Sequence, residues 1–270
     1  MRFKYEVSYV LAILNAERTI EECLNSIFSQ DYPWEKYEVI IVDGGSDDGT
    51  LEIIEKFMKR YKNMRLLHNH RKLSEGRGMS KDMGVTASRG KFVALLDHDN
   101  IIMHKDWVKK MLFPFFDNPK IMATQSMLAF EEEDSNFLKY VNAAGVEDAF
   151  AIPYSLVAQV VFHPERFELV KGKYYLHKLD KKRVLFGGAN GCMFRRETFD
   201  IIGGYTRDVN VSASMADFGM FFAVVKAARI HHKTGSNFLT FLKKKITYFH
   251  RFISYGYKEA NFKWVPDGIL

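Results

Sequence analysis

The stretch from Tyr37 to Thr50 reads YEVIIVDGGSDDGT. Tyr37–Val42 has the pattern of a buried strand, and glycines at positions 44, 45 and 49 mark a tight turn after it. Asp47 or Asp48 is placed to cap a helix that continues to Arg60. A strand, a glycine turn and a helix in direct succession predict an α/β fold.

Strand and helix signals alternate on both sides of this unit. The sequence predicts strands over Tyr5–Leu14, Met64–Leu67 and Phe92–Leu96, and helices from Thr19 and over Ser80–Ala87. Tyr5–Leu14 is continuously apolar after its first residues, which is typical of a strand buried on both faces. Thr19 with Glu22 three residues later indicates a capping box. The order β-α-β-α-β-α-β predicts a mainly parallel sheet with helices on both faces.

The chain after Asn100 is less regular. We expect a helix over Trp107–Phe116, a strand over Ile121–Phe130, a helix from Arg195 and a second helix from about Ser214 to Ala228. The acidic run Glu131–Asp134 is interpreted as a solvated loop or the start of a helix.

Composition narrows the class of protein. The chain has 270 residues, of which 47% are hydrophobic, enough to bury a full core. The net charge is +6 and the isoelectric point is about 9.1. This charge favours anionic partners such as nucleotides, nucleic acid or a lipid surface, although many soluble proteins are equally basic.

The cysteines and the hydropathy pattern predict a cytoplasmic protein. Cys23 and Cys192 belong to no CxxC or Cys/His cluster, which argues against structural zinc and fits a reducing compartment. Met1–Val10 contains three charged residues and does not have the pattern of a secretory signal. No window reaches the roughly 18 to 20 apolar residues that a membrane span needs.

Carboxylates follow two of the predicted strands. Asp97 and Asp99 come directly after Phe92–Leu96, and Asp43 follows Tyr37–Val42. The carboxyl ends of parallel strands face the crevice in which α/β sheets bind ligands. Asp97 and Asp99 can hold a hard divalent cation that clamps a diphosphate, and Asp43 can accept hydrogen bonds from a base or a ribose. The alternative is that these residues only form turns or helix caps.

Several ordered motifs resemble those of family 2 glycosyltransferases, over most of residues 5–235. The matching segments are Val7–Asn15, Glu21–Ile27, Glu38–Thr50, Lys81–Gly84, Leu95–Asp99 and Gly187–Glu197. The sequence departs from the family at Leu14, where an aromatic residue is usual, and at Ala216, where a glutamate usually precedes the catalytic acid.

The resemblance implies a GT-A fold, that is, a Rossmann-like α/β fold with a mainly parallel central sheet flanked by helices. It also implies a nucleotide-sugar donor, with UDP favoured, and inversion at the anomeric carbon. The expected nucleotide-binding residues are Ala12, Leu14, Glu17, Asp43, Gly76, Lys81, Asp97 and His98. Asp99 and His232 are expected to bind Mn²⁺ or Mg²⁺, and Gly188, Asn190 and Gly191 to lie on the acceptor side.

Inverting transfer needs a base that takes the proton of the acceptor hydroxyl. The resemblance implies an acid at the start of a helix beyond the glycine-rich strand, and Asp217 is our predicted base. The alternative interpretations are that Asp217 only interacts with the dipole of its helix, or that Glu147-Asp148 supplies the base.

The resemblance divides the chain into a glycosyltransferase domain over 1–235 and an extension over 236–270. Residues 1–100 form the expected nucleotide-binding half and residues 101–235 the acceptor half. Between Lys226 and Leu270 there are nine Lys and Arg residues against two acids, and apolar residues recur near helical spacing. A basic amphipathic helix over 236–258 is expected to contact a membrane surface or to pack on the domain with its basic face in solvent.

The leading hypothesis is transfer of a single sugar to a hydroxyl acceptor, which on this view is a glycan or a lipid-linked glycan. The Gln-x-x-Arg-Trp motif of processive synthases is not found. A sugar-phosphate nucleotidyltransferase would need glycines near the first strand, and Asn15–Arg18 has none. A non-catalytic nucleotide-sugar-binding protein of the same fold is a further alternative. We expect no nucleic-acid partner, because the basic tail contains no known reader motif.

Overall fold

The computed structural model describes residues 3–69, 78–146, 152–182, 184–188 and 190–233, and five positions of the tail (238, 239, 242, 243 and 246). Gly76 of the predicted nucleotide site, Glu147-Asp148 and most of the predicted tail helix lie outside the described residues. Within the part of the chain that is described, no helix has the length and apolar character needed to cross a bilayer.

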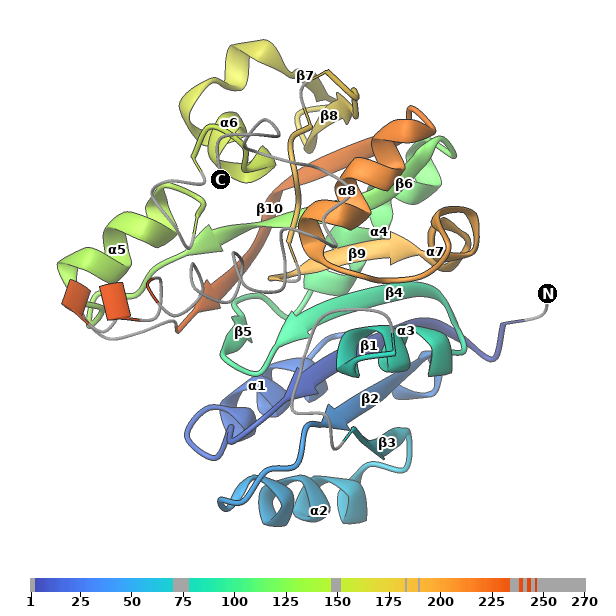
Figure 1. The fold of residues 1–270 in the computed structure, drawn as a ribbon, viewed down its shortest axis with the longest axis vertical. Coiled ribbons are helices and arrows are strands. Elements are labelled where there is room, and N and C mark those ends of the chain that lie inside the picture. Colours follow the sequence, from blue (N-terminus) through green and yellow to red (C-terminus); the bar gives the residue numbers. More distant parts are fainter. Residues whose placement is uncertain are drawn as a thin grey trace, which may run out of the picture.

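One twisted sheet runs through the whole molecule (Figure 1). Its strands are β1 (Tyr5–Ile13), β2 (Tyr37–Asp43), β3 (Met64–His68), β4 (Gly90–Asp97), β5 (Asn100–Ile102), β6 (Ile121–Ala129), β7 (Glu168–Val170), β8 (Tyr174–Lys178), β9 (Cys192–Arg195) and β10 (Phe221–His232). The order is β3-β2-β1-β4-β9-β6-β10-β8-β7, and β5 pairs with β10. Strands β5, β8 and β9 run opposite to the others, so the sheet is mainly parallel.

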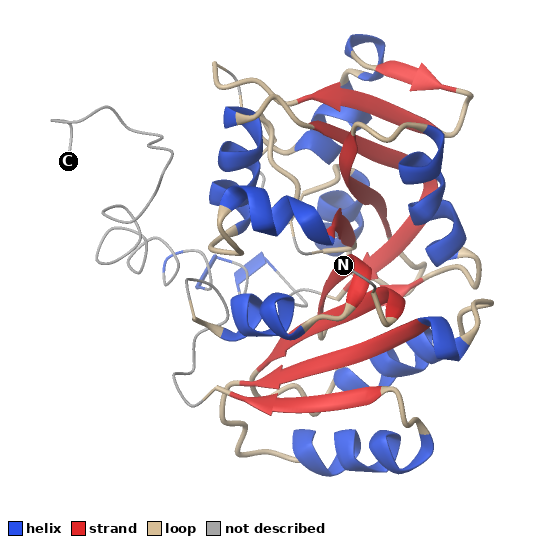
Figure 2. Ribbon diagram, turned by 90° about the vertical axis from the view of Figure 1, so that its right-hand side faces the viewer, coloured by secondary structure: helices blue, strands red, loops and turns tan. Residues whose placement is uncertain are grey.

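Helices cover both faces of the sheet (Figure 2). They are α1 (Ile20–Phe28), α2 (Thr50–Arg60), α3 (Ser80–Ala87), α4 (Trp107–Asp117), α5 (Asn136–Ala143), α6 (Leu156–Phe162), α7 (Arg196–Ile202) and α8 (Asp208–Asp217), with short 3₁₀ turns at Trp34–Lys36 and Pro164–Arg166. One core lies between the sheet and α1, α2 and α4. The other core lies between the sheet and α3, α6, α7 and α8.

Strand β2 shows why the sequence folds in this way. Val39 and Ile41 enter the first core, whereas Ile40 and Val42 enter the second. Successive side chains of a strand point to opposite faces, so a strand covered on both sides must be apolar at nearly every position. The continuous apolar runs therefore identified β1, β2 and β4 correctly.

The predicted elements up to residue 130 are confirmed with small shifts at their ends. The capping box at Thr19 is wrong, because the hydroxyl of Thr19 makes no cap bond to α1. It lies instead 2.7 Å from Nδ1 of His98. The acidic run Glu131–Asp134 is only partly solvated, because a carboxylate oxygen of Asp134 lies 2.9 Å from Nε2 of the buried His231.

The helix predicted from Ser214 to Ala228 is wrong. The helix α8 begins earlier and ends at Asp217, and Gly219 follows with φ of +58°, a left-handed conformation that ends helices. The apolar run after Gly219 forms strand β10 between β6 and β8. A short continuous apolar run does not distinguish a buried strand from a buried helix, so the pattern alone was ambiguous there.

The starts of the first four parallel strands are joined by the carboxylate of Glu38, which is fully buried. Its oxygens accept hydrogen bonds from the Ser8 hydroxyl at 2.8 Å, from the Arg89 guanidinium at 2.8 and 3.1 Å and from the Arg89 backbone N–H at 2.7 Å. Arg65 of β3 adds an ion pair at 3.3 Å. Burial alone would raise the pKa of Glu38, but the hydrogen bonds from Arg89 and Ser8 outweigh it and hold this pKa below its ordinary value.

We expect Glu38→Gln to lower the free energy of unfolding by about 2 kcal/mol or more at pH 7, because Arg89 and Arg65 lose their buried charged partner. The lowered pKa means that the carboxylate stabilises the fold above the ordinary glutamate pKa and loses this effect as the pH falls through the lowered value. Urea unfolding at pH 7 and at pH 3 measures this. Equal stability of wild type and variant at pH 7 would show that the Glu38 network does not hold these strands together.

Candidate active site

The carboxyl edge of the sheet gathers most of the predicted site residues. In the parallel register, Ile13 of β1 lies opposite Asp43 of β2, and Ala12 lies opposite Asp97 of β4. The two carboxylates therefore flank the end of β1, as the sequence predicted. Ala12 is buried between them, and Leu14, just beyond the strand, is 37% exposed.

Asp43 is buried and organises the turn that follows β2. One of its oxygens accepts hydrogen bonds from the N–H and the hydroxyl of Ser46, at 3.1 and 2.6 Å, and the other accepts from the N–H of Gly45 at 3.0 Å. Gly45 has φ of +94°, a conformation that requires glycine. The structure thus gives Asp43 a role in the turn, and contact with a base or a ribose stays a prediction.

The same turn is held against the end of β1. The backbone N–H of Asn15 donates to the Ser46 hydroxyl at 2.9 Å, and the backbone N–H of Glu17 donates to the Asp48 carboxylate at 3.2 Å. A Cβ atom added at Gly49 would meet the Glu17 side chain at 2.7 Å. Glu17 therefore packs against the turn that precedes α2, beside the predicted nucleotide pocket.

Asp97 ends β4 and forms an ion pair with a buried lysine. Nζ of Lys81, in the first turn of α3, lies 3.2 Å from Oδ1 of Asp97. The Lys81 side chain is 5% exposed, whereas that of Asp97 is 30% exposed. His98 turns away from this pair towards the hydroxyl of Thr19. The structure therefore brings Lys81 and Asp97 together, at a point where Asp97 reaches solvent.

Asp99 meets His232, although 133 positions separate them in the sequence. Strand β5 pairs antiparallel with the end of β10, so that Asn100 lies opposite His232. Nε2 of His232 is 3.3 Å from Oδ2 of Asp99, and the histidine is 3% exposed. Within the described residues no group of three His, Cys, Asp or Glu side chains is arranged as a complete metal site. Asp99 and His232 thus place one carboxylate oxygen and one imidazole nitrogen next to each other, as two possible ligands of one metal ion.

The glycine-rich segment before β9 also lies at this edge. The Gln125 side chain accepts from the N–H of Gly188 at 3.2 Å and donates to the carbonyl of Asn190 at 2.5 Å. Gly191 has φ of +69°, and a Cβ atom there would lie 2.1 Å from the hydroxyl of Ser126. The residues predicted for the acceptor side are therefore fixed in place from β6.

Asp217 does not lie with these residues. It is the last residue of α8 and precedes β10, whose first residue pairs with Ile121 at the opposite, amino edge of the sheet. In Figure 1 the arrow of β10 runs from that edge to the edge that carries His232. The Asp217 side chain is 58% exposed and forms an ion pair with Lys181 at 3.0 Å. Its predicted position at the start of a helix is wrong.

The acid that does lie beside the glycine-rich segment is Asp208, the first residue of α8. A Cβ atom at Gly188 would be 3.3 Å from Oδ2 of Asp208, and Tyr205 donates its hydroxyl proton to Oδ1. Asp208 was not among the residues predicted from the sequence. The available signal was Gly219, which favours a helix over residues 208–217 that stops before it, and so places the helix-start acid at position 208.

Comparison with known proteins identifies the family. The model of glycosyl transferase family 2 matches residues 8–202. An uncharacterised glycosyltransferase of Methanocaldococcus jannaschii is 32% identical over 206 residues, which cover 73% of this chain and 67% of that protein. Glycosyltransferase AglE of Haloferax volcanii is 36% identical over 104 residues, 38% of this chain. The match spans only 33% of AglE.

Two solved structures share the architecture. TarS 1–349 of S. aureus in complex with UDP-GlcNAc superposes with a TM-score of 0.61 at 17% identity, covering 96% of this chain and 68% of that one. A mannosyltransferase of Pyrobaculum calidifontis in complex with GDP-Man and Mn²⁺ gives a TM-score of 0.58 at 18% identity, covering 92% and 65%. These likenesses confirm the expected GT-A fold, and with the family match over residues 8–202 they show that the chain belongs to glycosyl transferase family 2.

Proposed function

We propose that the chain transfers a single sugar, with inversion, from a UDP-sugar to a hydroxyl of a glycan or a lipid-linked glycan. The observation that carries this proposal is the carboxyl edge itself. The pairs Lys81–Asp97 and Asp99–His232 lie at this edge, and Asp208 lies there too, beside Gly188 of the glycine-rich segment. Such a transfer requires a cationic group on the donor side, a pair of ligands for a metal ion and an acid that faces the acceptor segment.

The donor-side residues fit a divalent cation. Asp99 offers a hard carboxylate oxygen and His232 an imidazole nitrogen, a mixture that Mn²⁺ accepts readily and Mg²⁺ less so. Such an ion, when bound, neutralises charge that develops on the leaving diphosphate. The mannosyltransferase structure named above contains Mn²⁺ with its nucleotide sugar, which supports the assignment by analogy of fold. Lys81 would contribute a fixed positive charge near the nucleotide.

Asp208 replaces Asp217 as the proposed base. Its position at the first residue of α8 matches the requirement for an acid at a helix start beyond the glycine-rich strand. An ionised Asp208 would accept the proton of the acceptor hydroxyl. As the proton leaves, the oxygen of that hydroxyl attacks the anomeric carbon, and the bond from this carbon to the nucleoside diphosphate breaks. The inversion follows from attack opposite to the leaving group.

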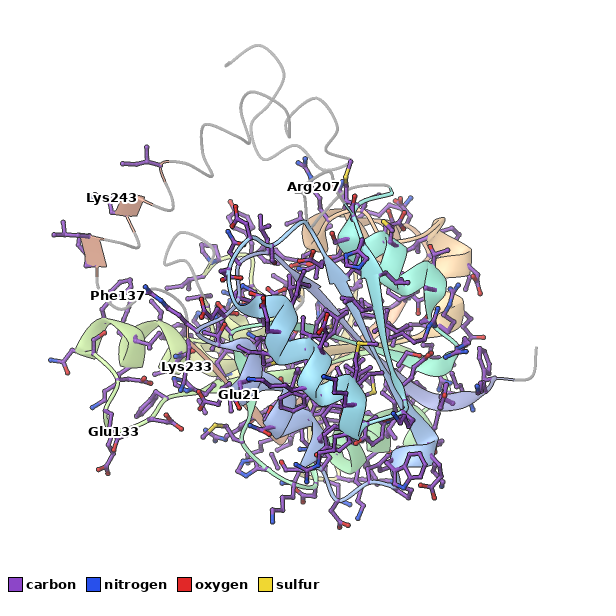
Figure 3. The ribbon with its side chains drawn as sticks, turned by 90° about the horizontal axis from the view of Figure 1, so that it is seen from below. Glu21, Glu133, Phe137, Arg207, Lys233 and Lys243 are labelled. Atoms are coloured by element: carbon purple, nitrogen blue, oxygen red, sulfur yellow. The ribbon has the colours of Figure 1, made fainter. Side chains whose placement is uncertain are left out.

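The tail would hold the enzyme at the cytoplasmic face of a membrane, where lipid-linked acceptors lie. Phe238, Leu239, Leu242 and Ile246 are all exposed, and so is Lys243. The ring of Phe238 meets that of Phe137 on α5 at 5.7 Å. In Figure 3 Phe137 and Lys243 lie on the same side of the molecule. Exposed apolar side chains interleaved with lysines favour binding to an anionic interface.

We expect Asp99→Ala to weaken the Mn²⁺-dependent binding of UDP by about tenfold or more, because one of two protein ligands is lost. Calorimetric titration of UDP and of GDP, with and without Mn²⁺, measures this and shows which base is preferred. His232→Ala should behave in the same way, and His163→Ala, an exposed histidine at the end of α6, is the matched control. Metal-independent UDP binding that is unchanged in both site variants would contradict the metal assignment.

The two candidate bases are separated by Asp208→Asn and Asp217→Asn. We expect the first to lower kcat by about a hundredfold or more and the second to change it less than twofold. Transfer from UDP-glucose and UDP-GlcNAc to octyl glycosides is the assay. A large loss in Asp217→Asn with full activity in Asp208→Asn would reverse the assignment, and nucleotide binding without any transfer would favour a non-catalytic protein.

Membrane contact is tested with vesicles of 30% anionic phospholipid at low salt. Replacing Lys243, Lys244 and Lys245 by glutamate should lower binding by about a hundredfold or more, since each basic residue near an anionic surface contributes about 1 kcal/mol. The matched control replaces Lys56, Lys59 and Arg60, exposed on α2, in the same way. Equal loss in both variants would mean that net charge, not the tail, drives binding.

A further inference from the structure

Tyr205 is a fully buried tyrosine whose polar groups point to two different acids. Its hydroxyl donates to Oδ1 of Asp208, and its backbone N–H donates to Oδ1 of Asp82 at 3.0 Å. Its ring packs against Phe199 of α7. A residue held through both its backbone N–H and its hydroxyl has little freedom to move, and so it can fix the carboxylate to which its hydroxyl is bonded.

Asp82 connects this tyrosine to the donor side of the site. It lies in the first turn of α3 and is 7% exposed. Its Oδ2 accepts from the N–H of Gly78 at 2.8 Å, while Oδ1 holds Tyr205. The neighbouring residue Lys81 forms the ion pair with Asp97. Two consecutive residues of α3 therefore touch the end of β4 and the loop that leads to Asp208.

The contact from Tyr205 sets which oxygen of Asp208 faces the acceptor segment. A carboxylate at the first residue of a helix can turn about its side-chain bonds, so its orientation needs an external constraint. With Oδ1 bonded to the tyrosine hydroxyl, Oδ2 is directed at Gly188. Because Gly188 has no side chain, it leaves room for an acceptor hydroxyl to approach Oδ2 of Asp208. The hydroxyl also stabilises the ionised carboxylate, which is the form that accepts a proton.

We propose that Tyr205 is the positioning residue for Asp208 and that Asp82 holds Tyr205, so that α3 fixes the donor-side carboxylate and the base in one arrangement. This inference rests on the proposed function of Asp208. It goes beyond that function because it assigns a task to two buried side chains outside the reacting groups. Tyr205 does not touch the substrate in this account, and its effect on the reaction passes through Asp208.

A merely structural hydroxyl would affect stability and nothing else, so the test needs a readout of the reaction. Tyr205→Phe keeps the ring and removes only the hydroxyl. Because Asp208 loses a hydrogen bond made to its charged carboxylate, kcat should fall about tenfold or more, with KM for the UDP-sugar and UDP affinity unchanged. The acidic limb of the kcat–pH profile should move to higher pH, because the ionised carboxylate loses a donor.

One titratable neighbour of Asp208 does not contribute to the acidic limb of that profile. Cys192 of β9 faces it, but burial, and then the charge of Asp208, raise the pKa of this thiol well above its ordinary value. Asp82 is linked to Asp208 through the backbone and the ring of Tyr205. A shift of the acidic limb on removal of one hydroxyl is therefore assigned to the Tyr205–Asp208 contact.

The matched control is Tyr174→Phe. The hydroxyl of Tyr174 donates to the carboxylate of Asp117 at 2.9 Å, at the end of α4 and away from the carboxyl edge. This variant removes the same kind of hydrogen bond and should leave kcat and the acidic limb at wild-type values. If Tyr205→Phe does not fold, Asp82→Ala tests the same chain of contacts, because it removes the oxygen that accepts from the Tyr205 backbone N–H, and the same loss in kcat is expected.

The outcomes separate this inference from the proposed function. If Asp208→Asn is inactive while Tyr205→Phe has wild-type kcat and an unshifted acidic limb, the positioning role is overturned and the base assignment stands. If Asp208→Asn retains full transfer, the base assignment fails and the role of Tyr205 fails with it. Loss of kcat in Tyr205→Phe, with a shifted limb and normal UDP binding, supports the proposal.

Discussion

The parallel register of β1 against β2 and β4 is the constraint on which the rest of the site depends. It places Ile13 opposite Asp43 and Ala12 opposite Asp97, so two strand-ending acids meet at one edge. The carboxylate of Glu38, at the other end of the same strands, bonds to residues from the starts of β1 and β4. A slip of one residue would exchange the faces of β1 and expose its core side chains, so the two-sided core enforces this register.

The other half of the molecule adds its residues by a less direct route. His232 reaches Asp99 because β10 runs from the amino edge of the sheet to its carboxyl edge, where its end pairs with β5. Asp208 reaches the glycine-rich segment because α8 begins at the carboxyl edge and returns the chain to the amino edge, where β10 starts. Asp82, Tyr205 and Asp208 connect α3 to α8 through one buried and one partly buried hydrogen bond. The candidate site is thus formed by segments that are far apart in the sequence.

The sequence was sufficient to predict an element wherever its local pattern is compatible with a single structure. The apolar runs of β1, β2 and β4, the turn at Asp43 and the pair Asp97 and Asp99 were predictable, because burial on both faces and strand-end acids leave local signatures. The apolar run after Gly219 fits a strand or a helix equally well, and only its place between β6 and β8 decides the matter. The same ambiguity led us to expect Asp217 at the start of a helix, whereas the helix α8 starts at Asp208 and ends at Asp217. The contacts of Thr19 with His98 and of Tyr205 with Asp208 are tertiary and have no local pattern.

The most direct test of the central claim is a crystal structure of the full chain with UDP and Mn²⁺, with manganese located by its anomalous signal. We expect one manganese peak within bonding distance of Asp99 and His232, with the UDP diphosphate beside it and the uracil near Asp43. A nucleotide bound at the opposite edge, near Lys181 and Asp217, or a manganese ion that contacts neither Asp99 nor His232, would contradict it.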